Sequence, residues 1–203
     1  MAQILKEDIK RRIDDAALEI FCEMGYQGAV MADIARIAGV SVGNIYRYYK
    51  NKEELFNLLV PMDIIDTLRD MIGDKFMIAD GMDLESARHA PAMDLMDAQL
   101  LDYLVTCRRQ IIIIMEEKEG NPYLGFKDEL VDLMTHMALR YTNTVDHPIH
   151  IDGLKQRMLR VVYENLYNAV VEILKSFSRA GEIKNAFGSL LDYHFFGVSE
   201  FMK

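Results

Sequence analysis

The segment from residue 29 to residue 56 constrains the fold of this chain most, because signals that start and stop helices follow one another closely within it. Apolar residues fall at helical spacing in Met31–Ala38, and Gly39 then provides a position where a left-handed turn costs little. Ser41 is a typical N-cap for a second helix over residues 42–49. The segment therefore predicts two short helices joined by a tight glycine turn.

A third helix is predicted to follow directly, since Asn51 with Glu54 three residues later is the pattern of a capping box. The apolar positions of the first two helices repeat at helical spacing and predict one buried face. The opposite face is polar and aromatic. The residues expected to face this core are Ile34, Ile37, Ile45 and Tyr49.

Several motifs of this segment match a known family. They are GY at 25–26, DIARIAGVS at 33–41, Gly43, the run Ile45–Tyr49, Asn51-Lys52-Glu53 and Leu55. With these motifs, residues 5–58 resemble the amino-terminal domain of the TetR family of transcriptional regulators. The resemblance implies an all-α fold, in which a three-helix helix-turn-helix head over residues 1–51 binds operator DNA. A helical body over residues 52–203 would bind an effector and form a homodimer.

One position departs from the family's pattern. The family usually has Thr or Ser at the start of the first helix of the motif, where the hydroxyl caps the helix and meets a phosphate. This chain has Ala29 and Val30 there. Main-chain N–H groups at the helix start are the remaining donors for a phosphate.

The outward face of the second helix is expected to read DNA bases. Arg47 carries the planar fork that pairs with guanine, Asn44 carries an amide that pairs with adenine, and Val42 fits a thymine methyl group. By resemblance, Tyr46 and Tyr48 donate hydrogen bonds to phosphates, while packing within the head is the alternative. The full predicted DNA-binding set is Arg36, Ser41, Val42, Gly43, Asn44, Tyr46, Arg47, Tyr48 and Lys52.

The distribution of charge allows the head to bind DNA although the chain has a net charge of −9. Residues 1–60 have a net charge of only −1, so most of the acidity belongs to the remainder. The segment 36–52 holds four cations and no acid, and a second basic cluster occupies 6–12. Both are expected to face phosphates, a solvated charged surface being the alternative. By resemblance, Lys52 anchors the DNA backbone.

The rest of the chain shows helical periodicity without strand alternation, which predicts an all-α body. Pro61 removes a hydrogen bond inside the first predicted helix and forces a kink or break, and a kink there is either a hinge or a packing detail. Gly120–Pro122 and Asp146–Pro148 are the clearest predicted loops. The predicted helices span 52–73, 82–88, 92–118, 123–145, 153–180 and 184–202.

Two apolar stripes near the carboxyl end predict a dimer interface, with ordinary core as the alternative. Two helices from each subunit would form a four-helix bundle. Gly188 and Gly197 cost about 1 kcal/mol each inside a helix unless close backbone approach offsets it. The interface residues predicted are Val162, Leu166, Val170, Ile173, Phe187, Leu191, Val198 and Phe201.

A largely apolar small-molecule effector is expected in the body. Fourteen methionines favour an adaptable cavity, or serve as core filler. Arg108 falls among apolar residues of the predicted helix 92–118, so it needs a ligand anion, an internal acid or a path to solvent. The candidate ligand residues are Tyr103, Cys107, Arg108, Met134, Met137, Tyr141, Tyr163 and Tyr167.

Other functional classes lack a sequence signal. No metal-site spacing, catalytic motif or cofactor motif occurs, so neither an enzyme nor a metal or cofactor site is expected. Cys22 and Cys107 are interpreted as small buried hydrophobes. The longest apolar run, Ile111–Met115, is too short to span a bilayer, and a cytoplasmic location is expected. The sequence thus predicts a homodimeric repressor that a small molecule releases from its operator. The alternative is an architectural or division-control DNA-binding protein without an effector.

Overall fold

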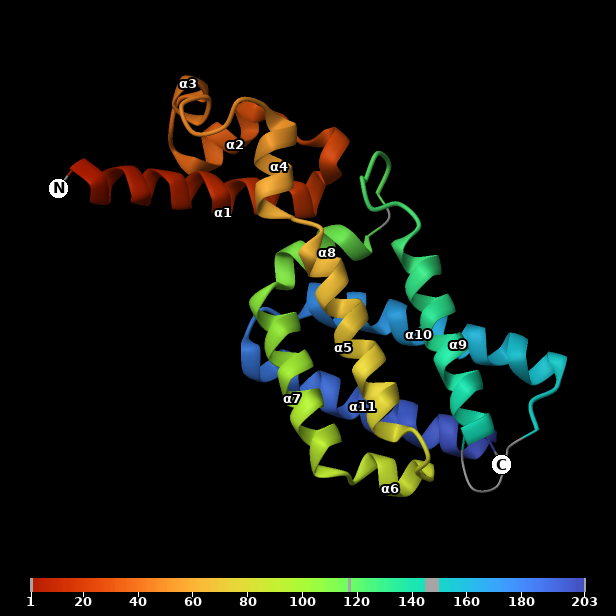
Figure 1. Cartoon of the computed structure of the whole chain (residues 1–203). Helices are drawn as coiled ribbons and strands as arrows, with labels where there is room; N and C mark the ends of the chain where they lie inside the picture. The colour runs from red at the N-terminus through yellow and green to blue at the C-terminus, as the bar shows by residue number, and fades with distance from the viewer. Residues whose placement is uncertain (1, 117, 145–149, 203) are drawn as a thin grey trace. The chain divides into compact units, whose positions relative to one another are not determined.

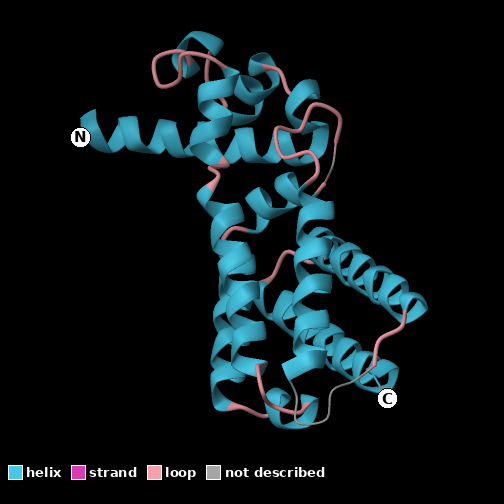
Figure 2. Ribbon diagram, turned by 45° about the vertical axis from the view of Figure 1, so that its right-hand side comes forward, coloured by secondary structure: helices cyan, strands magenta, loops and turns pink. Residues whose placement is uncertain are grey.

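The computed structural model describes residues 2–116, 118–144 and 150–202, and its ribbon consists of helices joined by loops (Figure 1, Figure 2). The all-α prediction is confirmed. The predicted loop at 146–148 lies outside the described residues. The helices are α1 (Ala2–Gly28), α2 (Met31–Ala38), α3 (Val42–Ile45), α4 (Lys52–Leu59), α5 (Asp63–Ala79), α6 (Leu84–Arg88), α7 (Pro91–Thr106), α8 (Arg108–Met115), α9 (Phe126–Thr144), α10 (Gly153–Ser176) and α11 (Ala180–Met202).

The kink or break predicted at Pro61 within the helix 52–73 is confirmed as a break, which separates α4 from α5. Val60 has left the helical conformation, with φ −126° and ψ 68°. Pro61 follows it, and proline both lacks an N–H group and disfavours a helical residue before it. The hinge role expected for Pro61 stays a prediction.

The predicted helix 92–118 is also interrupted. It divides at Cys107, whose φ of −98° and ψ of 22° end α7 before α8 begins at Arg108. Neither glycine nor proline marks this position in the sequence, so local signals did not reveal the break.

The chain forms two compact units. The first comprises residues 1–65 and 109–124, and the second comprises residues 66–108 and 125–203. Helices α4 and α8 therefore belong to the unit that contains α1, α2 and α3. The predicted boundary between a DNA-binding head and an effector-binding body, at residues 51 and 52, divides the chain by function and stays a prediction.

An aromatic cluster forms part of the core of the first unit. Phe21 and Tyr26 of α1 each meet the Phe56 ring of α4 edge-on, with ring centroids 5.1 and 4.9 Å apart. Tyr123 stacks on Phe56 at 6.0 Å and donates its hydroxyl hydrogen bond to the carbonyl of Val60. Such pairs add specific geometry to the burial of apolar area, so α4 is fixed from both sides.

Helix α8 is buried along its apolar half. All five residues of Ile111–Met115 are buried, which requires protein on every side of the helix. The buried amide of Asn121 donates to the carbonyl of Ile113 at 2.8 Å and satisfies the end of α8. After α8, the Lys118 ammonium donates to the carbonyl of Glu23 near the end of α1 at 3.1 Å.

The second unit is a helical body in which α10 packs against α9 and α11, and α11 packs against α7. Arg160 of α10 links to α9 by an ion pair with Asp128 at 2.7 Å and by a second one with Asp132. Near α6, a buried apolar cluster joins α5, α7 and α9. Its buried members are Ala79, Ala87, Met93 and Tyr141.

Candidate nucleic-acid interface

The glycine turn predicted between the first two helices of the motif is confirmed. Gly39 ends α2 in the left-handed region, with φ 65° and ψ 38°. The Arg12 guanidinium of α1 donates to the carbonyls of Ala38 and Gly39 at 2.5 and 3.1 Å. A Cβ at Gly39 would lie 2.6 Å from Arg12 Nη2. The backbone angle therefore favours glycine, and a side chain here would also displace the tip of Arg12 from its hydrogen bonds.

The second helix of the motif, α3, is shorter than the predicted span of 42–49. Ser41 caps it as predicted, since its hydroxyl oxygen accepts from the N–H of Asn44 at 3.2 Å. After Ile45 the chain continues as a tighter turn, in which the N–H of Tyr48 donates to the carbonyl three residues before it at 2.9 Å. Tight last turns of this kind are common at helix ends.

The inward face of the motif is confirmed except at one residue. Ile34 and Ile45 are fully buried and Tyr49 is 1% exposed, but Ile37 is 37% exposed. At 100° per residue, Ile37 lies on the far side of Ile34 from the buried alanines of α2, and so turns toward solvent. Tyr49 donates its hydroxyl hydrogen bond to Asp14 of α1, and burial raises its pKa to about 12.

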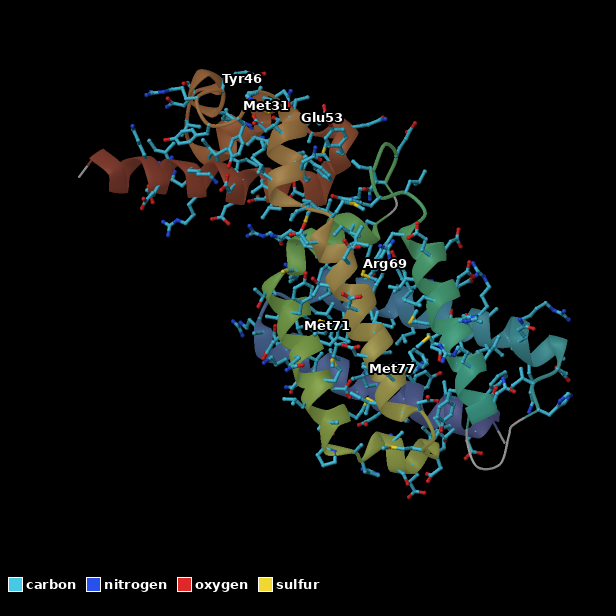
Figure 3. The ribbon with its side chains drawn as sticks, viewed as in Figure 1. Met31, Tyr46, Glu53, Arg69, Met71 and Met77 are labelled. Atoms are coloured by element: carbon cyan, nitrogen blue, oxygen red, sulfur yellow. The ribbon has the colours of Figure 1, made fainter. Side chains whose placement is uncertain are left out.

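The outward residues of α3 and its following turn lie together at the surface. Tyr46 is 52% exposed, and Figure 3 shows it at the α3 end of the first unit. Arg47 is exposed as well, and no group of the described residues forms an ion pair or hydrogen bond with its side chain. Arg36 on α2, by contrast, pairs with Asp33 at 3.3 Å. Val42 and Asn44 are half-buried, and Gly43 is exposed.

Two residues predicted to contact phosphates make hydrogen bonds within the protein, and their phosphate contacts stay a prediction. Tyr48 is half-buried and donates its hydroxyl to the Lys6 carbonyl at 3.2 Å. The Lys52 ammonium donates to the carbonyls of Tyr26 and Ala29 at 2.7 and 2.9 Å, and it lies 4.6 Å from the centre of the Tyr26 ring. These carbonyls end α1 and need donors, which explains why lysine is held there.

The starts of α2 and α4 differ in their capping. Val30 occupies the N-cap position of α2 without a side-chain hydrogen bond, because the valine side chain has no acceptor. Asn51 caps α4 as predicted, by accepting from the N–H of Glu54 at 2.8 Å. The Glu54 carboxylate completes the box one residue early, because it accepts from the N–H of Lys50 at 2.5 Å. The start of α4 is therefore determined by capping residues in the local sequence.

The candidate ligand residues all belong to the second unit, at different depths. Tyr141 and Tyr163 are buried, and the Tyr141 hydroxyl donates to the carbonyl of Met82 at 2.7 Å. Met134 and Tyr167 are buried too, whereas Tyr103, Cys107 and Met137 are half-buried.

Arg108 has a main-chain partner in place of the anion expected from the sequence. Its Nε donates to the carbonyl of Leu174 at 2.5 Å, at the end of α10. This contact follows from the break at Cys107, which places Arg108 at a helix start and not inside a long helix.

A partly buried polar cluster in the second unit was not predicted. The His194 ring of α11 contacts the Tyr163 ring of α10, with centroids 5.6 Å apart. Lys75 of α5 forms an ion pair with Asp97 of α7, and its charge acts on His194. Burial and the Lys75 charge lower the pKa of His194 to about 4. Sequence periodicity gives no signal for such a cluster, because each residue comes from a different helix.

The predicted dimer stripes face partly into the protomer. Phe187 and Val198 are 3% and 8% exposed, so they belong to the core of the second unit. Val162, Leu166, Val170, Ile173, Leu191 and Phe201 are half-buried. The large apolar side chains left exposed on α10 and α11 include Leu154, Met158, Val161, Tyr193 and Phe196.

The two cysteines are half-buried, so the expected full burial is wrong. Cys22 Sγ donates to the Arg109 carbonyl at 3.4 Å, while burial raises the pKa of Cys107. Within the described ranges, no three His, Cys, Asp or Glu side chains are grouped to hold a metal ion. In the same ranges, no helix has the length and apolar character needed to cross a membrane.

Comparison with known proteins gives matches in the first unit and a fold match for the chain. Residues 13–59 match the model of "Bacterial regulatory proteins, tetR family". The chain is 44% identical over 50 residues to the HTH-type transcriptional regulator YhgD of Bacillus subtilis. It is 40% identical over 73 residues to the HTH-type transcriptional regulator BetI of Escherichia coli.

These matches cover a minor part of each protein. They span 25% and 36% of this chain, and 26% and 37% of YhgD and BetI. A crystal structure of a TetR-like transcriptional regulator from Rhodococcus sp. RHA1 superposes with a TM-score of 0.50 at 17% identity, over 94% of this chain and 96% of that one. At this identity the superposition shows the fold alone.

Proposed function

We propose that the chain is a member of the TetR family of bacterial regulatory proteins and a homodimeric repressor that binds an operator and is released by a small molecule. The family consists of transcription regulators and not of enzymes. We also propose that the protein acts in the cytoplasm, where bacterial operators lie.

The observation that carries the proposal is the Arg47 side chain on the second helix of the motif. It is exposed and has no partner among the described residues, although Arg36, Lys50 and Lys52 nearby each have one. A guanidinium fork at this place is free to pair with guanine O6 and N7 in the major groove. Tyr46, also exposed beside it, is the proposed phosphate donor.

Homodimerisation is supported by two features of α10 and α11. Exposed apolar side chains such as Met158, Tyr193 and Phe196 lie on them without cover from the protomer. A side chain added at Gly188 or Gly197 would meet no atom within 4 Å, so contacts inside the protomer do not explain these helix glycines. A second copy of the chain packed on α11 would explain them. Two heads would then need a spacing of about 34–36 Å to reach successive major grooves.

Release by a small molecule is proposed because the second unit is a compact body of its own that contains the buried tyrosines Tyr141, Tyr163 and Tyr167. A ligand releases DNA only if it binds the DNA-free conformation more tightly than the bound one. By linkage, operator DNA must then weaken ligand binding by the same factor, typically about 5- to 150-fold.

The DNA-binding part is tested by selecting an operator from a pool of random duplexes with the purified protein. Arg47→Ala should lose about 1–3 kcal/mol of specific affinity and relax preference at one position in each half-site. Arg157→Ala, which removes an exposed arginine from α10, is the matched control and should bind as the parent protein does. Unchanged affinity and preference in Arg47→Ala would contradict the assignment.

A further inference from the structure

The second unit holds a cluster of four polar side chains from four helices, of which Tyr163 is buried and Lys75, Asp97 and His194 are half-buried. Tyr163 of α10 and His194 of α11 are in ring contact at 5.6 Å. Lys75 of α5 pairs with Asp97 of α7, and its ammonium is close enough to act on His194. Polar groups are costly to bury, so a cluster of this kind requires partners.

The Tyr163 hydroxyl lacks such a partner. The residue is only 5% exposed, and no hydrogen bond to it is found among the described residues. Every fully enclosed side-chain nitrogen or oxygen of these residues does have a partner. The Tyr163 oxygen must therefore border space that a small molecule or water can reach. A ligand oxygen at this place would satisfy the hydroxyl.

The His194 imidazole is the second available donor. Burial and the positive charge of Lys75 lower its pKa, so it is neutral at physiological pH and carries one N–H group. The charged groups around it are Lys75 and the Asp97 partner of that lysine, and the Tyr163 ring covers it from α10. No hydrogen bond to its nitrogens is found within the described part of the chain.

The hydrogen-bond donors of the cluster outnumber its carboxylate, which favours a ligand with a negative charge. Lys75, Tyr163 and His194 are donors, whereas Asp97 is the one carboxylate of the cluster and already pairs with Lys75. An added cation would meet the Lys75 charge, while an added anion would gain up to three donors.

The residues near the cluster favour a ligand that also has an apolar part. Ala79 lies one helical turn after Lys75, and Met93 lies one turn before Asp97. Both belong to the buried apolar cluster near α6. A ligand with its head at the polar cluster can therefore place an apolar part beside these side chains.

We propose that Tyr163, His194 and Lys75 bind the carboxylate of an amphipathic effector whose apolar part packs in the body. The proposal rests on the proposed function, because it names the chemical class that the regulator senses. It places the head of the ligand on residues from α5, α10 and α11.

Direct calorimetric titration of the full-length protein with decanoate tests the proposal, with decanol as the uncharged control of equal chain length. Decanoate should bind at least about tenfold more tightly than decanol. Tyr163→Phe keeps the ring against His194 and removes only the hydroxyl. It should weaken decanoate binding by roughly 10- to 100-fold, as expected for a hydrogen bond to a charged group.

Tyr193→Phe removes a hydroxyl from a tyrosine of α11 that is 78% exposed, and it should bind decanoate as the parent protein does. The proposal is overturned if decanoate does not bind, if decanol binds equally well, or if Tyr163→Phe binds decanoate with unchanged affinity. Operator release is measured separately. Decanoate that binds through Tyr163 and leaves the operator complex intact would support this site and refute the proposed release. Release of the operator by another class of molecule would support the proposed release and refute this site.

Discussion

Replacement of His194 by glutamine should remove a specific part of the acid sensitivity of this protein. In the folded chain, burial and the charge of Lys75 lower the pKa of the imidazole from 6.5 to about 4. As pH falls, the unfolded chain binds this proton before the folded chain does. The stabilisation by neutral His194 is therefore complete above a pH of about 6.5 and is lost as the pH falls toward about 4.

The magnitude follows from the size of the shift. Each pKa unit corresponds to about 1.4 kcal/mol, so the whole shift is worth roughly 3 kcal/mol. Between about pH 8 and about pH 5, linkage gives a loss of about 2 kcal/mol of unfolding free energy from this one residue. His194→Gln has no such group. Its own deficit relative to the parent protein should shrink by about 2 kcal/mol over the same interval.

Urea unfolding at a fixed protein concentration measures both curves, because the proposed dimerisation would link stability to concentration. His89→Gln is the control, since His89 is exposed at the end of α6, and its curve should run parallel to that of the parent protein. A constant difference between the parent protein and His194→Gln at every pH would refute the reasoning. The imidazole would then titrate alike in the folded and unfolded chains.

Four further substitutions test other contacts. Lys52→Met should lower the unfolding free energy by about 1–3 kcal/mol, because carbonyls at the end of α1 lose their donor, and should leave the salt dependence of operator binding unchanged. A salt slope reduced by about one would instead identify Lys52 as a phosphate anchor. Phe196→Asp should give a folded monomer in sedimentation, whereas Val198→Asp should unfold the protomer, since Val198 is 8% exposed. Gly39→Ala should cost at least about 1–2 kcal/mol in thermal unfolding, and unchanged stability would contradict the required left-handed turn.

Local signals predicted the DNA-binding motif well. Gly39 and Ser41 act through their own backbone or through a residue three positions away, and both perform the predicted role. The outward position of Arg47 and the inward position of Ile45 follow from helical spacing alone. The predicted burial of Ile37 was wrong because helical spacing identifies an apolar stripe but not the centre of its buried part. The small buried residues of α2 determine that centre.

Features that depend on distant residues were not predicted. The break at Cys107 accompanies a hydrogen bond from Arg108 to Leu174, which lies 66 residues further along the chain. The engagement of Lys52 likewise requires the end of α1 to approach α4. The polar cluster around His194 draws on four helices, none of which reveals its contribution by pattern. Such contacts are settled by packing after the helices have formed.

The inclusion of residues 109–124 in the first unit has a consequence for protein synthesis. On the ribosome, α1 to α4 emerge well before Ile111–Met115 and Asn121, which supply buried parts of the same unit. A nascent chain that ends soon after α4 would expose the surface that α8 later covers. Folding of the DNA-binding unit is therefore completed only after more than half of the protein has been translated. Chimeras that exchange heads between relatives should carry this second segment with the first.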